Sequence, residues 1–226
     1  MKNEKISDFT IYRLSIYLRC LEHLVAAEVT TTSSQALAEQ FQLNSAQIRK
    51  DLTAFGEFGI RGVGYNVAEL RTHLRKILGL YTVHKVGIVG AGHLGMALAD
   101  YQGFQPTPFQ VVALFDHHAK EKETQSASGI PLYPIKDLKS VVARENITIG
   151  VLCVPAEEAQ GMTSLMIQAG ITAILNFAPV RLNIERGIKV KTMDLSMSFE
   201  SLSYFLSNQQ PSGTAKARAA TAQEGI

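Results

Sequence analysis

The stretch Lys85-Val86-Gly87-Ile88-Val89-Gly90-Ala91-Gly92-His93-Leu94-Gly95 decides the fold of this chain. It begins as an apolar run typical of a buried strand, turns at the pattern G-x-G-x-x-G, and continues as the apolar residues 96–99. In the order strand, glycine turn and helix, backbone N–H groups can approach a pyrophosphate, and the helix N-terminus adds positive potential. We therefore predict a dinucleotide site that includes the loop residues Gly90, Ala91, Gly92, His93, Leu94 and Gly95.

A second strand strengthens this prediction. Residues 110–115 form another apolar run, and it ends at Asp116, 21 residues after Gly95. A carboxylate at about this spacing accepts hydrogen bonds from the adenosine ribose and repels a 2′-phosphate. The predicted ligand is therefore NADH or NAD⁺ rather than the phosphorylated dinucleotides.

The rest of this region alternates strands with helices. Strand-like runs are centred on residues 130–133, 147–154, 172–177 and 188–192, and helical patterns cover residues 135–144 and 156–169. Such alternation predicts an α/β fold with a parallel, doubly wound sheet of the Rossmann type. Ligands of these sheets lie beyond the carboxyl ends of the strands, so residues 154–155 and 176–179 complete the predicted rim.

The first 80 residues have a different pattern. Helical periodicity covers residues 8–27, 35–41 and 46–55, with N-cap side chains available in Thr31-Thr32-Ser33-Ser34, and β-forming residues alternate with glycines over 57–67. Three helices followed by a short hairpin predict a winged helix-turn-helix whose third helix enters the major groove. The expected DNA contacts are Ser45, Gln47, Arg49, Lys50, Thr53, Arg61 and Tyr65.

Charge supports this reading only locally. The formal net charge of +2 does not indicate nucleic-acid binding, but residues 49–76 carry six Lys or Arg against three Asp or Glu. An ordinary helical subdomain with solvated charged faces stays open as the alternative. With 226 residues and 46% apolar composition, we expect two compact domains, 1–80 and 81–194.

Several classes of site and location are disfavoured. Cys20 and Cys153 lie far apart and outside any C-x-x-C motif, so they are expected to be reduced thiols. His117-His118 has no further ligand at metal-binding spacing, and no metal is predicted. No apolar h-region opens the chain, and no run approaches about 18 apolar residues. A cytoplasmic protein without a membrane segment is expected.

One helical pattern is left over at the C-terminus. Over residues 195–208, Leu195, Phe199, Leu202, Phe205 and Leu206 recur at helical spacing after the sheet is complete. This helix needs a partner surface, and packing on a second subunit is one possibility. The tail 209–226 is polar and is expected to be disordered.

Several of these segments together resemble the Rex family, the redox-sensing transcriptional repressors of bacteria, over about residues 5–207. The matching segments are residues 45–52, 55–59, 61–65, 90–95, 100–104 and 175–180. The resemblance implies a homodimer that binds a palindromic operator when NADH is scarce and leaves it when the NADH/NAD⁺ ratio rises. It also implies that the C-terminal helix is swapped onto the partner subunit.

The resemblance also assigns residues. The glycine loop and Asp116 would hold the adenosine and pyrophosphate, whereas Tyr101, Val154, Pro155 and Ala178 would lie nearer the nicotinamide. Family members can carry a phenylalanine facing the nicotinamide where this chain has Leu195; leucine keeps an apolar contact but not ring stacking. The polar positions that would rearrange between the redox states are Arg19, Tyr101 and Asp194.

Two other functions remain as alternatives. An NAD-dependent oxidoreductase would need an acid or base beside the nicotinamide and usually a second catalytic domain, and the roughly 30 residues between Phe177 and the predicted tail leave little room for one. A coenzyme A binding module could use the same glycine loop, but Asp116 would lie near the 3′-phosphate of that ligand.

Overall fold

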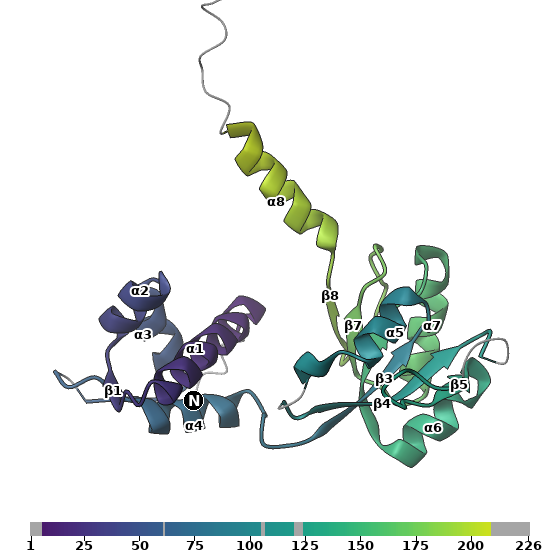
Figure 1. Cartoon of the computed structure of the whole chain (residues 1–226), viewed down its shortest axis with the longest axis horizontal. Coiled ribbons are helices and arrows are strands. Elements are labelled where there is room, and N and C mark those ends of the chain that lie inside the picture. Colours follow the sequence, from purple (N-terminus) through teal and green to yellow (C-terminus); the bar gives the residue numbers. More distant parts are fainter. Residues whose placement is uncertain (1–5, 61, 105–106, 120–123, 209–226) are drawn as a thin grey trace, which may run out of the picture. The chain divides into compact units, whose positions relative to one another are not determined.

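The computed structural model describes residues 6–60, 62–104, 107–119 and 124–208 (Figure 1). The chain divides into two compact units, Met1–Val83 with Gly103–Pro108, and His84–Gln102 with Phe109–Ile226. Arg61, the predicted tip of the wing, and the tail 209–226 lie outside the described residues.

Four α-helices build the part of the first unit that the structure describes, and each begins at a side-chain cap. They are α1 Asp8–Ala26, α2 Ser34–Phe41, α3 Ser45–Thr53 and α4 Val67–Ile77. In each case a serine or asparagine accepts a hydrogen bond from an N–H of the first turn, which would otherwise have no partner. The capping residues are Ser7, Ser33, Asn44 and Asn66.

The wing differs from the predicted hairpin. β2 Tyr65–Asn66 pairs antiparallel with β1 Thr31–Thr32, and among the described residues of the predicted hairpin an isolated bridge joins Ile60 to Gly64. Gly64 has φ +102, and a Cβ there would lie 2.3 Å from the carbonyl oxygen of Thr32, so only glycine permits this approach. Thr31 and Thr32 therefore form a strand, and of the four predicted capping residues Ser33 caps α2.

The core of the first unit lies along α1. Leu14, Leu21 and Leu24 are almost completely buried, and α1 packs against α4, which contributes the fully buried Leu74. The buried positions follow the three- and four-residue spacing of the sequence.

The second unit contains a parallel sheet of six strands in the order β5-β4-β3-β6-β7-β8. The strand order reverses beside β3, as in the doubly wound dinucleotide-binding folds. The predicted α/β fold is confirmed. The strands are β3 His84–Val89, β4 Phe109–Asp116, β5 Leu132–Pro134, β6 Ile147–Leu152, β7 Ala173–Asn176 and β8 Lys189–Thr192.

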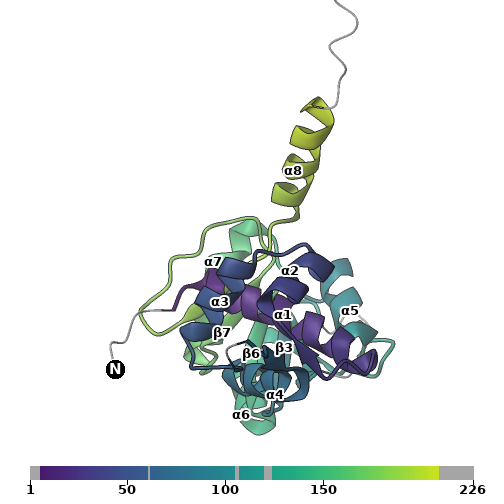
Figure 2. The same ribbon diagram turned by 90° about the vertical axis from the view of Figure 1, so that its left-hand side faces the viewer.

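Helices cover both faces of this sheet, with α5 on one face and α6 and α7 on the other; Figure 2 shows these helices in a view turned by 90°. Along β3, Ile88 packs on the α5 side and Val89 on the side of α6 and α7, because neighbouring strand residues point to opposite faces. Both faces are thus buried, which explains the continuous apolar runs of the sequence. The bounds are α5 His93–Ala99, α6 Leu138–Glu145 and α7 Ala156–Gln168, with short 3-10 turns η1 Gln102–Phe104 and η2 Ile135–Asp137.

The last helix, α8 Leu195–Asn208, follows β8 and buries none of its residues. Phe199 is 70% exposed and Leu206 is 65% exposed. A search of the described residues finds no helix long and apolar enough to cross a membrane.

Candidate nucleotide site and nucleic-acid interface

The three glycines of the loop have three different surroundings. Gly90 has φ +99, and a Cβ there would lie 2.3 Å from the carbonyl oxygen of Cys153. At Gly95 a Cβ would lie 1.9 Å from the carbonyl oxygen of Gly90, so α5 packs directly on the turn. Nothing lies within 4 Å of a Cβ built on Gly92. Two glycines therefore shape the loop, and the third leaves it open to a ligand.

Asp116 lies beside this loop because β4 is hydrogen-bonded to β3. Its Oδ2 accepts a hydrogen bond of 2.9 Å from the backbone N–H of Ala91, and its Oδ1 accepts one of 2.8 Å from the N–H of His118. The carboxylate expected at the ribose therefore also fixes the start of the glycine loop.

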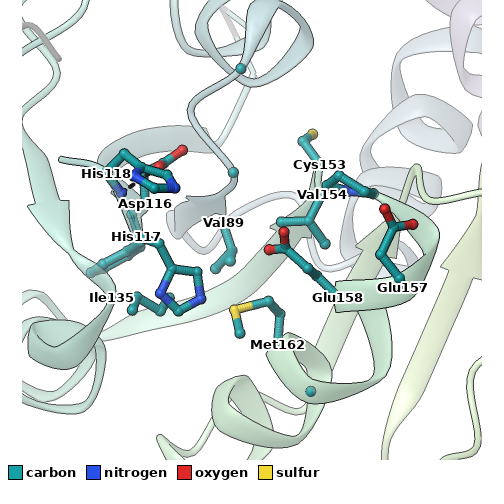
Figure 3. A pocket seen from close by; sticks show the side chains of 15 residues that line it. Val89, Asp116, His117, His118, Ile135, Cys153, Val154, Glu157, Glu158 and Met162 are labelled. Carbon is teal, nitrogen blue, oxygen red and sulfur yellow. Dashed lines mark hydrogen bonds between the residues drawn. The ribbon is translucent and has the colours of Figure 1, made fainter. Parts of the chain in front are cut away.

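A cavity of about 500 Å³ opens at the carboxyl ends of β3, β4 and β6 (Figure 3). Its volume is within the range of small-molecule and cofactor sites. In Figure 3 the side chains of Asp116, His117 and His118 lie on one side of the cavity, and Glu157 and Glu158 of α7 lie on the other. The remaining lining residues are Val89, Gly90, Gly92, Phe115, Ile135, Cys153, Val154, Pro155, Gly161 and Met162.

The predicted nucleotide contacts are thus only partly brought together. Tyr101 is 58% exposed and Ala178 is 1% exposed, and neither lines the cavity. Ala178 donates its N–H to Oδ1 of the buried Asn176 at 2.9 Å, so its loop is held in one shape. The other predicted positions divide into cavity-lining residues, Gly90, Gly92, Asp116, Val154 and Pro155, and loop residues outside the lining, Ala91, His93, Leu94 and Gly95.

Cys153 lies at the carboxyl end of β6 and lines the cavity. Burial raises the pKa of its thiol to about 12, because the charged thiolate loses its hydration. Cys153 is therefore a neutral, weakly nucleophilic part of the wall at physiological pH. Among the described residues, no group of three or more His, Cys, Asp or Glu side chains could hold a metal ion.

In the first unit, the predicted DNA contacts are spread around α3, whose buried residues are Ile48, Asp51 and Leu52. Lys50 and Thr53 are exposed, whereas Ser45 is partly buried at the first position of the helix. Thr53 donates its hydroxyl to the carbonyl oxygen of Arg49 at 2.8 Å.

Arg49 faces α2. Its Nη1 donates a hydrogen bond of 2.9 Å to Oγ of Ser34, the first residue of α2. The same residues line a cavity of about 360 Å³ together with Phe58 and Tyr65, so the predicted contacts Arg49 and Tyr65 share one surface with the turn of the wing. A guanidinium beside a helix N-terminus is suited to bind an anion such as a DNA phosphate.

The sequence reasoning missed a buried carboxylate under α3. Asp51 is 3% exposed and accepts hydrogen bonds from Arg13, Tyr17 and Gln47. The hydrogen bond to Asp51 therefore orients the side chain of Gln47, a predicted DNA contact. No periodicity marks this cluster, because its members lie up to 38 residues apart.

The three predicted switch positions belong to different units. Arg19 is an exposed residue of α1 in the first unit, whereas Tyr101 and Asp194 belong to the second. Oδ1 of Asp194 accepts a hydrogen bond of 2.9 Å from the N–H of Ser196 at the start of α8. Their rearrangement stays a prediction.

Family models match both units. Residues 5–53 match the family described as "Putative DNA-binding protein N-terminus", and residues 82–180 match the family described as "CoA binding domain". The first match lies over α1 to α3, and the second lies over the nucleotide cavity.

Two solved structures are similar over nearly the whole chain. One is the repressor RSP in complex with β-NAD⁺ and operator DNA, with a TM-score of 0.85 and 36% identity over 90% of this chain and 93% of that one. The other is RSP in complex with β-NADH, with a TM-score of 0.81 and 34% identity over 91% and 96%.

Curated relatives give the same result. The redox-sensing transcriptional repressor Rex of Brevibacillus brevis is 40% identical over 91% of this chain and 99% of its own length, and that of Carboxydothermus hydrogenoformans is 44% identical over 90% and 98%. These relatives are named repressors rather than enzymes, which supports the prediction that the chain is not an oxidoreductase. With this identity over about nine-tenths of its length, the chain belongs to the Rex family of redox-sensing transcriptional repressors.

Proposed function

We propose that this chain represses transcription by binding a palindromic operator as a homodimer, and that NADH releases it whereas NAD⁺ does not. The observation that carries the proposal is the presence, in one chain, of a capped helix-turn-helix and a Rossmann cavity with an open glycine loop and an adjacent carboxylate. A repressor that meets both DNA and the NAD(H) pool acts in the bacterial cytoplasm.

The pyrophosphate of a dinucleotide needs close access to the backbone of the glycine loop, and the cavity provides it. The space beside Gly92, where a side chain would stand, allows the pyrophosphate to approach the backbone. Asp116 would accept from the adenosine ribose, and the loop residues from Gly90 to Gly95 would surround the phosphates. Val154 and Pro155 would form an apolar wall at the nicotinamide, with Tyr101 and the backbone near Ala178 close to it.

The difference between NADH and NAD⁺ is one hydride, which converts a planar cation into a neutral ring. An apolar wall favours the neutral ring, because a cation loses hydration there. To move the dimer from nearly all bound to nearly all released, the total difference in binding free energy must be about 5 kcal/mol. Two nucleotides per dimer would each supply part of this free-energy difference. The polar groups proposed to rearrange are Arg19, Tyr101 and Asp194.

For DNA, α3 would enter the major groove with Ser45, Gln47 and Lys50 nearest the bases. Arg49 and Tyr65 would contact the phosphate backbone beside the N-terminus of α2, and Thr53 and Arg61 would contact the flanking backbone. The hydrogen bond from Arg49 to Ser34 supports this division, because it directs the guanidinium away from the helix axis of α3 and toward α2.

A homodimer is supported by α8. Its apolar side chains, from Leu195 to Leu206, are more than half exposed, which is a large apolar surface to leave in water. A second copy, onto which the helix is swapped, would bury this surface and would give two α3 helices for two half-sites.

Binding of coenzyme A is a second candidate, favoured by the family match over residues 82–180. Three carboxylates, Asp116, Glu157 and Glu158, line the cavity and would repel the extra phosphate of that ligand. Competition between coenzyme A and NADH in a fluorescence titration would separate the two ligands, and we expect coenzyme A not to displace NADH.

An electrophoretic mobility shift on a palindromic Rex-type operator tests the main proposal. NADH and NAD⁺ are titrated separately at constant salt concentration, because affinity for DNA depends steeply on salt. We expect NADH to release the operator at concentrations at which NAD⁺ leaves it bound. Equal effects of the two nucleotides would refute the proposal, as would steady turnover of NADH with a carbonyl substrate.

A further inference from the structure

The carboxylate of Asp51 is buried between α1 and α3, and each of its oxygens accepts two hydrogen bonds. Oδ2 accepts from Nε of Arg13 at 2.5 Å and from the hydroxyl of Tyr17 at 2.9 Å. Oδ1 accepts from Nη2 of Arg13 at 2.7 Å and from Nε2 of Gln47 at 2.8 Å. Three of the four bonds come from α1, and the fourth comes from Gln47, a partly exposed residue of α3.

This arrangement determines which way the Gln47 amide faces. An ionised carboxylate can only accept hydrogen bonds, so the nitrogen of the amide, and not its oxygen, must face Asp51. One N–H is used in that bond. We take this to be the N–H trans to the carbonyl oxygen, which leaves the oxygen and the second N–H side by side on the other edge of the amide.

An acceptor beside a donor is the pattern that recognises adenine. In the major groove a glutamine oxygen accepts from the N6 amino group of adenine while its N–H donates to N7. Gln47 is the third residue of α3 and is partly exposed, and the first residues of a recognition helix are those that reach base edges.

We propose that Asp51 is a positioning residue that fixes the Gln47 amide for recognition of an adenine in each operator half-site. The proposal rests on the proposed function, because it requires α3 to enter the major groove. Asp51 itself does not touch the DNA; it acts through Gln47, and Arg13 holds it in place from α1.

The Asp51 carboxylate stays ionised at neutral pH, as the orientation of the Gln47 amide requires. Burial alone would raise the pKa of Asp51, but the hydrogen bonds from Arg13, Gln47 and Tyr17 outweigh burial and hold that pKa below its ordinary value. Asp51 is therefore an acceptor throughout the neutral range, and the amide orientation does not change with pH there.

The experiment measures base preference rather than affinity alone. Full-length wild type, Gln47→Ala, Asp51→Asn and the double variant are each titrated with operator duplexes in which one base pair of both half-sites is changed at a time. We expect wild type to prefer adenine at one position by about 5- to 150-fold. Gln47→Ala should lose that preference, and Asp51→Asn should lose it although Gln47 is intact.

The double variant and one control separate positioning from general damage. Asp51→Asn should add nothing to Gln47→Ala at that position, because both act through the same amide. Tyr17→Phe removes a bond from the other carboxylate oxygen, so it should keep the adenine preference. Asp51→Glu keeps the charge and displaces the carboxylate, and it should retain the fold by circular dichroism while losing the preference.

Two results would overturn the inference. One is an adenine preference that survives in Asp51→Asn or Asp51→Glu, and the other is a uniform loss of affinity for all duplexes with the preference unchanged. Failure of the proposed function is a different result, and it is seen with the wild-type protein alone. In that case the wild type does not bind the operator, or NADH does not release it.

Discussion

Gly92 and Gly95 lie three residues apart in one loop, yet an added methyl group would meet different surroundings at each. Gly92→Ala places the methyl in open space at φ −78, a conformation that alanine adopts readily. We expect the unfolding free energy to change by less than about 0.5 kcal/mol. The affinity for NADH should fall about tenfold or more, because the methyl occupies the approach to the pyrophosphate.

Gly95→Ala is the matched variant. Its methyl would lie 1.9 Å from the carbonyl oxygen of Gly90, so α5 must move away from the turn. We expect a loss of about 1–3 kcal/mol in the unfolding free energy, measured by urea denaturation without nucleotide. Equal stability of the two variants would contradict the different roles assigned to the two glycines.

Cys153 gives a prediction about reactivity. Because burial raises the pKa of its thiol to about 12, the thiolate fraction at pH 8 is on the order of 10⁻⁴, and alkylation by iodoacetamide should be slow. The rate should rise as the pH approaches 12, and NADH should lower it further because Cys153 lines the cavity that the nucleotide would fill. Mass spectrometry measures the rate, with Cys153→Ser as the control that reports Cys20 alone. Labelling of the native protein at the rate of the urea-unfolded chain would contradict the burial.

At the scale of elements, the ion pair between Arg13 and Asp51 ties α1 to α3. Arg13→Met would leave the buried carboxylate without its cation. We expect a loss of about 2 kcal/mol at pH 7, below the 3–5 kcal/mol of fully buried pairs, because the side chain of Arg13 is 30% exposed.

The cost of Arg13→Met should depend on pH. The pKa of Asp51 in the folded chain lies below its value of about 4 in the unfolded chain. The contribution of the ionised carboxylate is therefore complete above about pH 4 and is lost as the pH falls through the lower, folded value. Thermal unfolding of both proteins from pH 7 to pH 3 checks this, and a difference in melting temperature that grows in acid would contradict it.

The long elements could be predicted from the sequence, because each carries its own signal. The strand ending at Val89 is buried on both faces and reads as an apolar run, and α1 shows its buried leucines at helical spacing. β1 could not be predicted. It has two residues, Thr31–Thr32, and its partner strand lies more than 30 residues later in the chain.

Site residues could be predicted where a local motif fixes their position, and were missed where packing of distant segments brings them together. Asp116 could be predicted because its distance from the glycine loop along the chain is fixed by one strand-helix-strand unit. Glu157 and Glu158 line the same cavity only because β6 lies beside β3 in the sheet. Asp51 reads in sequence as one charge among others, and its partners on α1 lie 34 and 38 residues before it. These contacts arise from packing between segments that are distant in the chain, so no local sequence pattern predicts them.

At the scale of the whole molecule, the formal net charge of +2 is small for a DNA-binding protein. In the proposed homodimer, affinity for the operator would come from two copies that bind together, each with its own α3 and phosphate contacts. We propose that α8 joins the two copies, because its apolar side chains are exposed in the single chain.

The last prediction concerns the double variant Phe199→Ser and Phe205→Ser. These rings are 70% and 56% exposed, so their replacement costs a folded monomer little but removes much of the apolar surface proposed to pair two copies. Sedimentation equilibrium should show a monomer, whereas Ser203→Ala, on the same exposed helix, should remain a dimer. Binding to the palindrome should weaken to that of one half-site. The slope of log affinity against log salt should fall by about half, because a monomer neutralises half as many phosphates. A double variant that sediments as a dimer and keeps the full salt slope would show that another surface joins the two copies.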